Sequence, residues 1–124
     1  MVIKKAFTFT GIPFFYEGSL DDKLKVYPSG NEDEPTGTIA YIDNQIIEFV
    51  KETINERQLI KMGACRDCPS KNSLGELLLM RKKSPQFLSY LLPLLEEADF
   101  LTHYTEGKTI WVRTKWTKLF LFFR

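Results

Sequence analysis

One stretch of this chain, residues 81–101, restricts its possible folds most strongly, because it holds the pattern of an α-helix around two prolines. Four leucines occur at i, i+3, i+4 and i+7, the spacing that gathers side chains on one helix face: Leu88, Leu91, Leu92 and Leu95. Ser84 predicts the N-cap, and Pro85 suits the first helical position, where the N–H that proline lacks would have no partner. The stretch therefore predicts one helix whose leucine face turns toward a core.

The second proline, Pro93, falls inside this predicted helix, on the side opposite the leucines. The same side carries Gln86, Ser89, Tyr90 and Glu97. A proline there removes the hydrogen bond to the carbonyl of Ser89, on a side where water or a partner can replace it. We therefore expect one bent helix, convex toward solvent, rather than two helices. Its polar side would be free to recognise a partner.

The N-terminal third of the chain has the composition of β-structure. The segments "KKAFTFT" and "KLKVY" alternate apolar and polar residues with period two, and "TGTIAYI" is rich in β-forming residues. Turn signals separate them: "GIP", "YEGS" and the acidic "PSGNEDEPTG". Residues 1–42 therefore predict a β-meander with an acidic, solvated loop.

From residue 43 onward the period becomes helical. "YIDNQIIEFVKETINER" carries an apolar stripe, with Asp43 or Asn44 as N-cap and an end near Arg57. "QLIKM" predicts a short strand, "GACRDCPSKN" a loop, and "LGELLLMRKK" a short helix capped by Ser73. After the leucine helix, "FLTHYTEGKTIWVRTK" predicts a β-hairpin in which Gly107 takes positive φ. The apolar tail "WTKLFLFFR" predicts a strand that is buried in the fold or in a dimer.

The predicted order is helix, short strand, helix, tight basic turn, helix and β-hairpin. On the residues "SLGELL", "SPQFLSYLL", "LEEADFL" and the Gly107-Lys108 turn, the chain resembles the winged helix-turn-helix superfamily. The resemblance covers residues 43–115 and implies a winged helix core there. Together with the patterns on either side, it predicts a single α+β domain with an N-terminal β-meander (1–42), this core (43–115) and a C-terminal strand or dimerisation segment (116–124). The sequence departs from the superfamily pattern at the charged turn Arg81-Lys82-Lys83 and at Asp99, which stands where a glycine often ends the third helix. Asp nevertheless tolerates left-handed geometry better than most residues.

The resemblance also implies binding of double-stranded DNA, with the start of the third helix in the major groove. The implied base-facing residues are Gln86, Ser89 and Tyr90. The implied phosphate contacts are the nearby cations: Arg81, Lys82, Lys83, Lys108, Arg66 and Lys71. The formal net charge is only +1, so the concentration of cations between residues 61 and 93 carries this expectation, not the charge of the whole chain.

The expected role is a small homodimeric transcriptional regulator or partition-type adaptor that reads paired half-sites. The alternative is a protein–protein interaction subunit that uses the same fold without nucleic acid.

The remaining motifs favour neither catalysis nor a metal. Cys65 and Cys68 form a C-x-x-C pair that could be half a zinc site or a redox pair, but a structural zinc needs about four ligands and His103 is the sole histidine. Reduced thiols and no cofactor are therefore expected. Phosphate-binding glycine loops and nucleophile–base pairs are missing from the sequence, which predicts no enzyme.

The sequence also lacks an apolar run of about 18 residues, the length that a membrane span needs, and it lacks a signal peptide. A cytoplasmic protein without a membrane partner is therefore expected.

Overall fold

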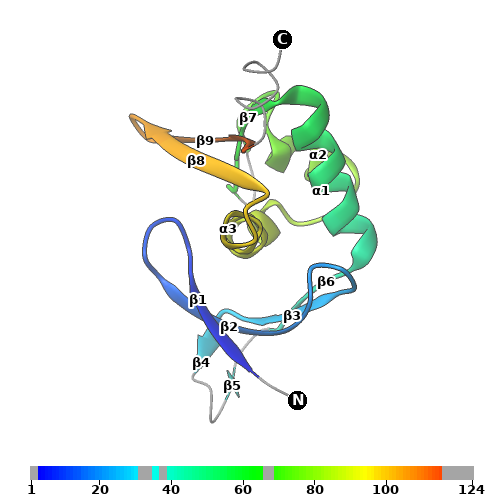
Figure 1. The fold of residues 1–124 in the computed structure, drawn as a ribbon, viewed down its shortest axis with the longest axis vertical. Coiled ribbons are helices and arrows are strands. Elements are labelled where there is room, and N and C mark those ends of the chain that lie inside the picture. The colour runs from blue at the N-terminus through cyan, green and yellow to red at the C-terminus, as the bar shows by residue number, and fades with distance from the viewer. Residues whose placement is uncertain (1–2, 31–34, 37–38, 66–68, 116–124) are drawn as a thin grey trace.

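The computed structural model describes residues 3–30, 35–36, 39–65 and 69–115, and these form an α+β fold with two main antiparallel sheets (Figure 1). The N-terminal sheet has the strand order β1-β2-β3-β6. Its strands are β1 (Lys4–Phe7), β2 (Pro13–Gly18), β3 (Leu24–Tyr27) and β6 (Ala40–Ile42). The two-residue strands β4 (Ser29–Gly30) and β5 (Pro35–Thr36) pair with each other between β3 and β6. The predicted β-structure of this region is confirmed.

One strand of this sheet, β2, was not predicted, because its residues "YEG" had been interpreted as a turn. The strand lacks alternation, since consecutive phenylalanines are buried on its two faces. Phe14 is buried on the inner face and Phe15 on the outer face. The turn signal marks only the strand's end, where Gly18 has a φ of 102°.

The second half of the chain contributes three α-helices and a three-stranded sheet of order β7-β9-β8. In chain order the elements are α1 (Asn44–Arg57), β7 (Leu59–Lys61), α2 (Leu74–Met80), the 3-10 turn η1 (Pro85–Phe87), α3 (Leu88–Glu97), β8 (Leu101–Glu106) and β9 (Thr109–Thr114). Asp43 caps α1 by accepting from the Ile46 N–H at 2.9 Å, and Ser73 caps α2 by accepting from the Glu76 N–H at 3.1 Å. These caps were predicted because they are encoded by adjacent residues.

The leucine helix runs through Pro93 without a break, as predicted, although its first turn is the 3-10 turn η1. Ser84 accepts a hydrogen bond from the Gln86 N–H at 3.2 Å, and Asp99 takes the left-handed conformation with a φ of 64°. The expectation that Pro93 faces solvent was wrong, because its side chain is buried. Leu94, beside it, is only 3% exposed. Both sides of α3 are therefore covered.

The N-terminal sheet explains this burial, because it lies across α3 on the side away from the hairpin of β8 and β9 (Figure 1). Phe14 from β2 meets Tyr90 of α3 edge-to-face, with ring centroids 5.1 Å apart. The residues of the two sheets and the three helices then form one continuous apolar cluster. The helix that was predicted to have a free polar side is instead the central element of the core.

A close backbone contact fixes the start of α2 against the segment that follows β7. The Gly75 N–H donates to the Met62 carbonyl at 2.9 Å, and Lys61 forms an isolated parallel bridge with Ser73. Gly63 has a φ of 62°. A Cβ at Gly75 would stand 2.6 Å from the carbonyl carbon of Gly63, so only glycine fits this approach.

Two further expectations concern regions that the structure covers only in part. The C-terminal segment 116–124, which was expected to close the sheet or to form a dimer, lies outside the described residues. Within the described ranges, every helix is too short or too polar to cross a membrane.

Candidate binding groove

The basic turn between α2 and η1 is a helix C-cap in which a lysine occupies the position usual for glycine. Lys82 has a φ of 61°, its N–H donates to the Leu79 carbonyl at 2.9 Å, and the Lys83 N–H donates to the Leu78 carbonyl at 2.9 Å. These two hydrogen bonds define a Schellman motif. Because the motif holds the backbone of the turn, it presents the side chains of Lys82 and Lys83 to solvent.

Arg81, the third cation of the turn, points elsewhere. Its guanidinium carbon lies 3.9 Å from the centroid of the Phe49 ring, on α1. A guanidinium over an aromatic face is attracted to the ring's electrons. Arg81 is therefore an exposed residue whose guanidinium lies on α1, and it does not line the groove that Lys82 and Lys83 border.

Lys82 and Lys83 border a groove of about 840 Å³ between β6 and the start of η1. Gln86 contributes a polar, exposed side chain. The apolar and aromatic part of the lining is formed by Pro28, Ile39, Ala40, Tyr41, Leu79, Pro85, Phe87 and Tyr90. Among the described residues that line the groove, none is Asp or Glu. The site therefore combines an apolar floor with a cationic edge.

Two large apolar side chains of this groove are unusually open to solvent. Tyr41 is 63% exposed and Leu79 is 43% exposed. Tyr41 also has the ammonium of Lys25 at 6.0 Å from its ring centroid. No sequence pattern had indicated Tyr41, because its place beside the basic turn depends on the packing of the N-terminal sheet against α3.

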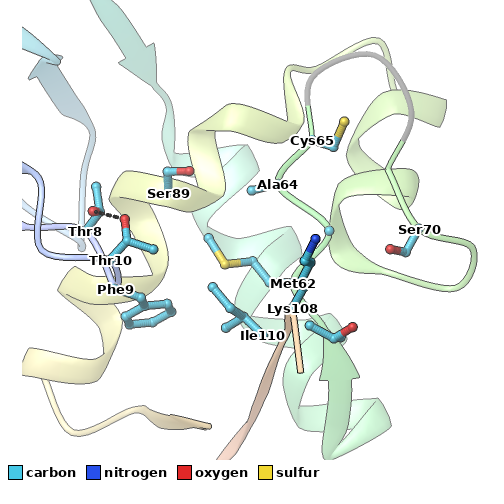
Figure 2. Close-up of a pocket in the computed structure, with 12 residues that line it drawn as sticks. Thr8, Phe9, Thr10, Met62, Ala64, Cys65, Ser70, Ser89, Lys108 and Ile110 are labelled. Atoms are coloured by element: carbon cyan, nitrogen blue, oxygen red, sulfur yellow. Dashed lines mark hydrogen bonds between the residues drawn. The ribbon is translucent and has the colours of Figure 1, made fainter. Parts of the chain in front are cut away.

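Two of the three predicted base-facing residues, Gln86 and Tyr90, line this groove, and the third, Ser89, does not. At the groove Gln86 is exposed, whereas Tyr90 is half-buried and its ring also packs against Phe14. Ser89 is partly buried and faces a second cavity, toward which Lys108 also points (Figure 2). The expectation of one solvent-facing polar side was therefore wrong in position for Ser89, which lies beside the β1–β2 loop, whereas Tyr90 is half-buried but still lines the groove.

The remaining predicted cations lie apart from the groove. Lys108 is in the two-residue turn of the β8–β9 hairpin, and Lys71 is exposed in the loop before α2. Arg66 and Cys68 lie outside the described residues. In the part of the chain that the structure describes, no three His, Cys, Asp or Glu side chains are grouped to hold a metal ion.

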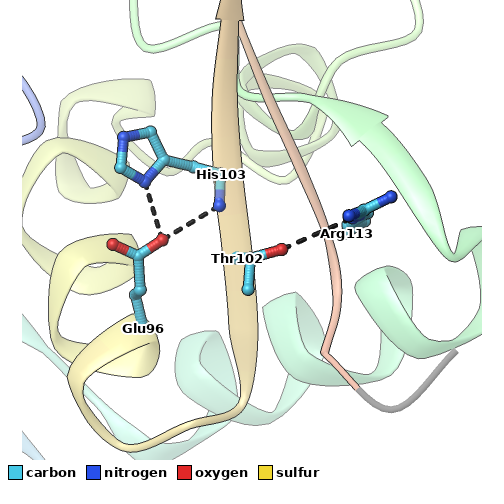
Figure 3. A network of polar contacts seen from close by, with 4 residues as sticks. All are labelled: Glu96, Thr102, His103 and Arg113. Carbon is cyan, nitrogen blue, oxygen red and sulfur yellow. Dashed lines mark hydrogen bonds and ion pairs between the residues drawn. The ribbon is translucent and has the colours of Figure 1, made fainter. Parts of the chain in front are cut away.

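The sole histidine takes part in a polar network between α3 and β8 (Figure 3). The Nδ1 atom of His103 lies 2.7 Å from Oε2 of Glu96, and the His103 backbone N–H donates to the same oxygen at 2.9 Å. The imidazole stacks on Phe9 of the β1–β2 loop, with ring centroids 3.8 Å apart. His103 therefore connects α3, the hairpin and the N-terminal sheet.

Comparison of the chain with protein-family models, curated proteins and solved structures gave no match. Its function is therefore inferred from the geometry of its surfaces.

The burial of Tyr90 predicts a loss of stability at alkaline pH. Burial raises the pKa of Tyr90 above its ordinary 10.0, and burial together with the carboxylate of Glu97 raises the pKa of Tyr16. A phenol whose pKa is higher in the folded than in the unfolded protein contributes stability to the fold. This contribution is fully present below the pKa of the unfolded state, and it is lost as pH rises through the pKa of the folded state. We expect Tyr90→Phe to move alkaline unfolding, followed by circular dichroism, to higher pH. An unchanged transition in both Tyr90→Phe and Tyr16→Phe would contradict this account.

Proposed function

We propose that this protein is a non-enzymatic binding module that holds an acidic, partly apolar polypeptide segment in the groove beside Lys82 and Lys83. We further propose that residues 43–115 form a winged helix whose third helix is covered by the chain's own N-terminal sheet. The order α1, β7, α2, α3, β8, β9 and the sheet order β7-β9-β8 support this assignment.

The observation that carries the proposal is the composition of the groove. Exposed apolar side chains that lie together on a surface are typical of interaction sites, and aromatic residues are common anchors in them. Tyr41 and Leu79 supply such anchors, while Lys82 and Lys83 supply positive charge, and the described part of the lining holds no carboxylate. Charge at the edge of an interface mainly steers and selects the partner. An acidic segment with apolar residues complements both parts.

Duplex DNA is the second candidate, and one observation favours it. Lys82, Lys83 and Gln86 are exposed next to one another at the start of η1, which corresponds to the part of a recognition helix that enters the major groove. The burial of Pro93 would limit base contacts to the start of the helix, where Tyr90 is half-buried at the groove. A cytoplasmic regulator of this kind would pair two copies through residues 116–124, which lie outside the described residues.

Replacing the groove's charges or its aromatic anchor is expected to weaken peptide binding. The probes are a fluorescent peptide of alternating Glu and Leu residues and a fluorescent random-sequence DNA duplex, both followed by anisotropy over a salt series. We expect Tyr41→Ala to weaken the peptide complex by about tenfold, because an anchor side chain is lost. Lys82→Glu with Lys83→Glu should weaken it by at least as much and reduce its salt dependence.

Matched controls separate the two candidates. Met80→Ala removes an apolar side chain that is 74% exposed next to Leu79 but does not line the groove. Lys4→Glu with Lys71→Glu changes the charge equally at exposed sites outside the groove. Peptide binding that survives Tyr41→Ala and Leu79→Ala would overturn the proposal. Duplex binding that is sensitive to the groove lysines and indifferent to Tyr41→Ala would establish the second candidate instead.

A further inference from the structure

A second cavity, of about 260 Å³, lies between segments that are far apart in the sequence (Figure 2). Its walls come from the β1–β2 loop, the segment after β7, the N-terminal half of α3 and the turn of the β8–β9 hairpin. Its volume is below the roughly 300–1,000 Å³ of sites for drug-sized ligands. The cavity therefore suits a small molecule, and it is distinct from the peptide groove.

The polar groups of this cavity are cationic or hydroxyl-bearing. Lys108 contributes an ammonium, and hydroxyls come from Thr8, Thr10, Ser89 and others; none of the described residues that line the cavity is Asp or Glu. Among the described residues, neither the Lys108 ammonium nor the Ser89 hydroxyl has a partner in an ion pair or a hydrogen bond. These groups are therefore available to a ligand that accepts hydrogen bonds and carries negative charge.

The two threonines add one more donor. Oγ1 of Thr8 accepts the Ile12 N–H at 3.0 Å and lies 3.1 Å from Oγ1 of Thr10. The two hydroxyls have two protons, and their mutual hydrogen bond uses one of them. Whichever threonine donates in that bond, the other proton remains for a ligand. The β1–β2 loop therefore presents a hydroxyl donor on the side of the cavity opposite the hairpin.

Apolar side chains complete the lining. Phe9, Met62 and Ile110 border the cavity, and Phe9 is held in place by its stack on His103. Because the Glu96 carboxylate holds that imidazole in turn, the Phe9 wall is supported from α3. The cavity is therefore shaped before any ligand enters.

We propose that this cavity binds a small organic anion, with its carboxylate or phosphate head on Lys108, Ser89 and the Thr8–Thr10 pair. Its apolar body rests against Phe9, Met62 and Ile110. The proposal is independent of the groove's function, since no residue of this cavity lines the groove. A bound anion would join the N-terminal sheet to the hairpin and raise the melting temperature of the full chain, because a ligand that binds only the folded state stabilises it.

The test uses three probes on the full chain: isovalerate, its uncharged analogue isovaleramide, and inorganic phosphate. Calorimetry and thermal melts measure affinity and stabilisation, and amide NMR shifts locate the site. We expect isovalerate or phosphate to raise the melting temperature and to shift residues 8–10 and 89, while isovaleramide does neither. Binding of isovalerate alone identifies a carboxylate ligand with an apolar body, and binding of phosphate alone identifies a phosphate head.

Variants decide whether the assigned groups bind the anion. Lys108→Gln and Ser89→Ala should each weaken binding by about tenfold, the loss of one charge-assisted hydrogen bond. Lys71→Gln, at an exposed site outside the cavity, should leave the affinity unchanged. The proposal fails if neither anion binds, if Lys108→Gln binds as the parent does, or if Lys71→Gln loses as much affinity as Lys108→Gln.

Discussion

Gly75→Ala is expected to lower the free energy of unfolding by about 3 kcal/mol or more, at the upper end of what overpacking costs. The added Cβ would stand 2.6 Å from the carbonyl carbon of Gly63 and nearer still to its oxygen. Backbone atoms cannot rotate away as a side chain can, and the Gly75 N–H is bonded to the Met62 carbonyl at 2.9 Å. Relief would require α2 to separate from the segment after β7. Denaturant unfolding at constant m-value measures the loss.

Gly107→Ala is the matched control, because it tests a glycine without the close contact. Gly107 has a φ of 63°, and a Cβ there would meet nothing within 4 Å. Its substitution should therefore cost only the strain of a left-handed alanine, about 1 kcal/mol. If Gly75→Ala destabilised the protein no more than Gly107→Ala, the close approach of the two backbones at Gly63 would be refuted.

Phe14→Ala is expected to cost about 3–5 kcal/mol, the usual range for truncating a buried phenylalanine. The Phe14 side chain is 1% exposed and lies between the N-terminal sheet and α3. Its removal leaves a cavity beside Tyr90, since the strand on which it lies cannot move inward without disrupting its pairing with β1 and β3. Chemical denaturation gives the stability change, and hydrogen exchange shows whether the amides of α3 lose protection.

Phe7→Ala provides the comparison within the same sheet. Phe7 is 53% exposed and lies on the outer face, so its truncation should change stability by no more than about 0.5 kcal/mol. Equal effects of Phe14→Ala and Phe7→Ala would mean that the sheet does not cover α3. In that case Tyr90 and Pro93 would again be candidates for contact with DNA.

The features that could be predicted from the sequence are those encoded by neighbouring residues. Asp43 and Ser73 cap helices whose first turns follow immediately, and Gly107 marks a hairpin turn between two β-rich runs. Asp99 takes left-handed geometry at the end of the leucine helix. Each of these depends on a few consecutive residues, so no tertiary contact had to be known.

The burial of α3 under the N-terminal sheet could not be predicted from adjacent residues, because the residues that cover the helix lie 70 or so positions earlier in the chain. Periodicity identified the leucine face, but it assigned Tyr90 and Pro93 to solvent by elimination. The signal that could have corrected this is the run "YLLPLL", in which Leu94 lies beside Pro93 on the supposed polar side. A helix that is apolar around most of its circumference is typical of a central position.

The candidate groove was predicted in part. Lys82, Lys83, Gln86 and Tyr90 were named as DNA-binding candidates because the basic turn and the start of a helix are adjacent in sequence, and all four line the groove. Tyr41 was missed, since it reaches the groove only through the docking of β6. Arg81 was grouped with its neighbours by charge, whereas its stack on Phe49 separates it from them.

The central position of α3 has a consequence for how the protein unfolds. One side of the helix packs against the N-terminal sheet and the other against the helical core and the hairpin, with Leu88, Leu91, Leu92, Leu94 and Leu95 all buried. If either layer detached from α3, buried leucines of this helix would become exposed, and the packing of the other layer against the helix would be weakened as well. We therefore expect the two sheets to form a single cooperative unit, in which the N-terminal strands and the hairpin melt at the same temperature.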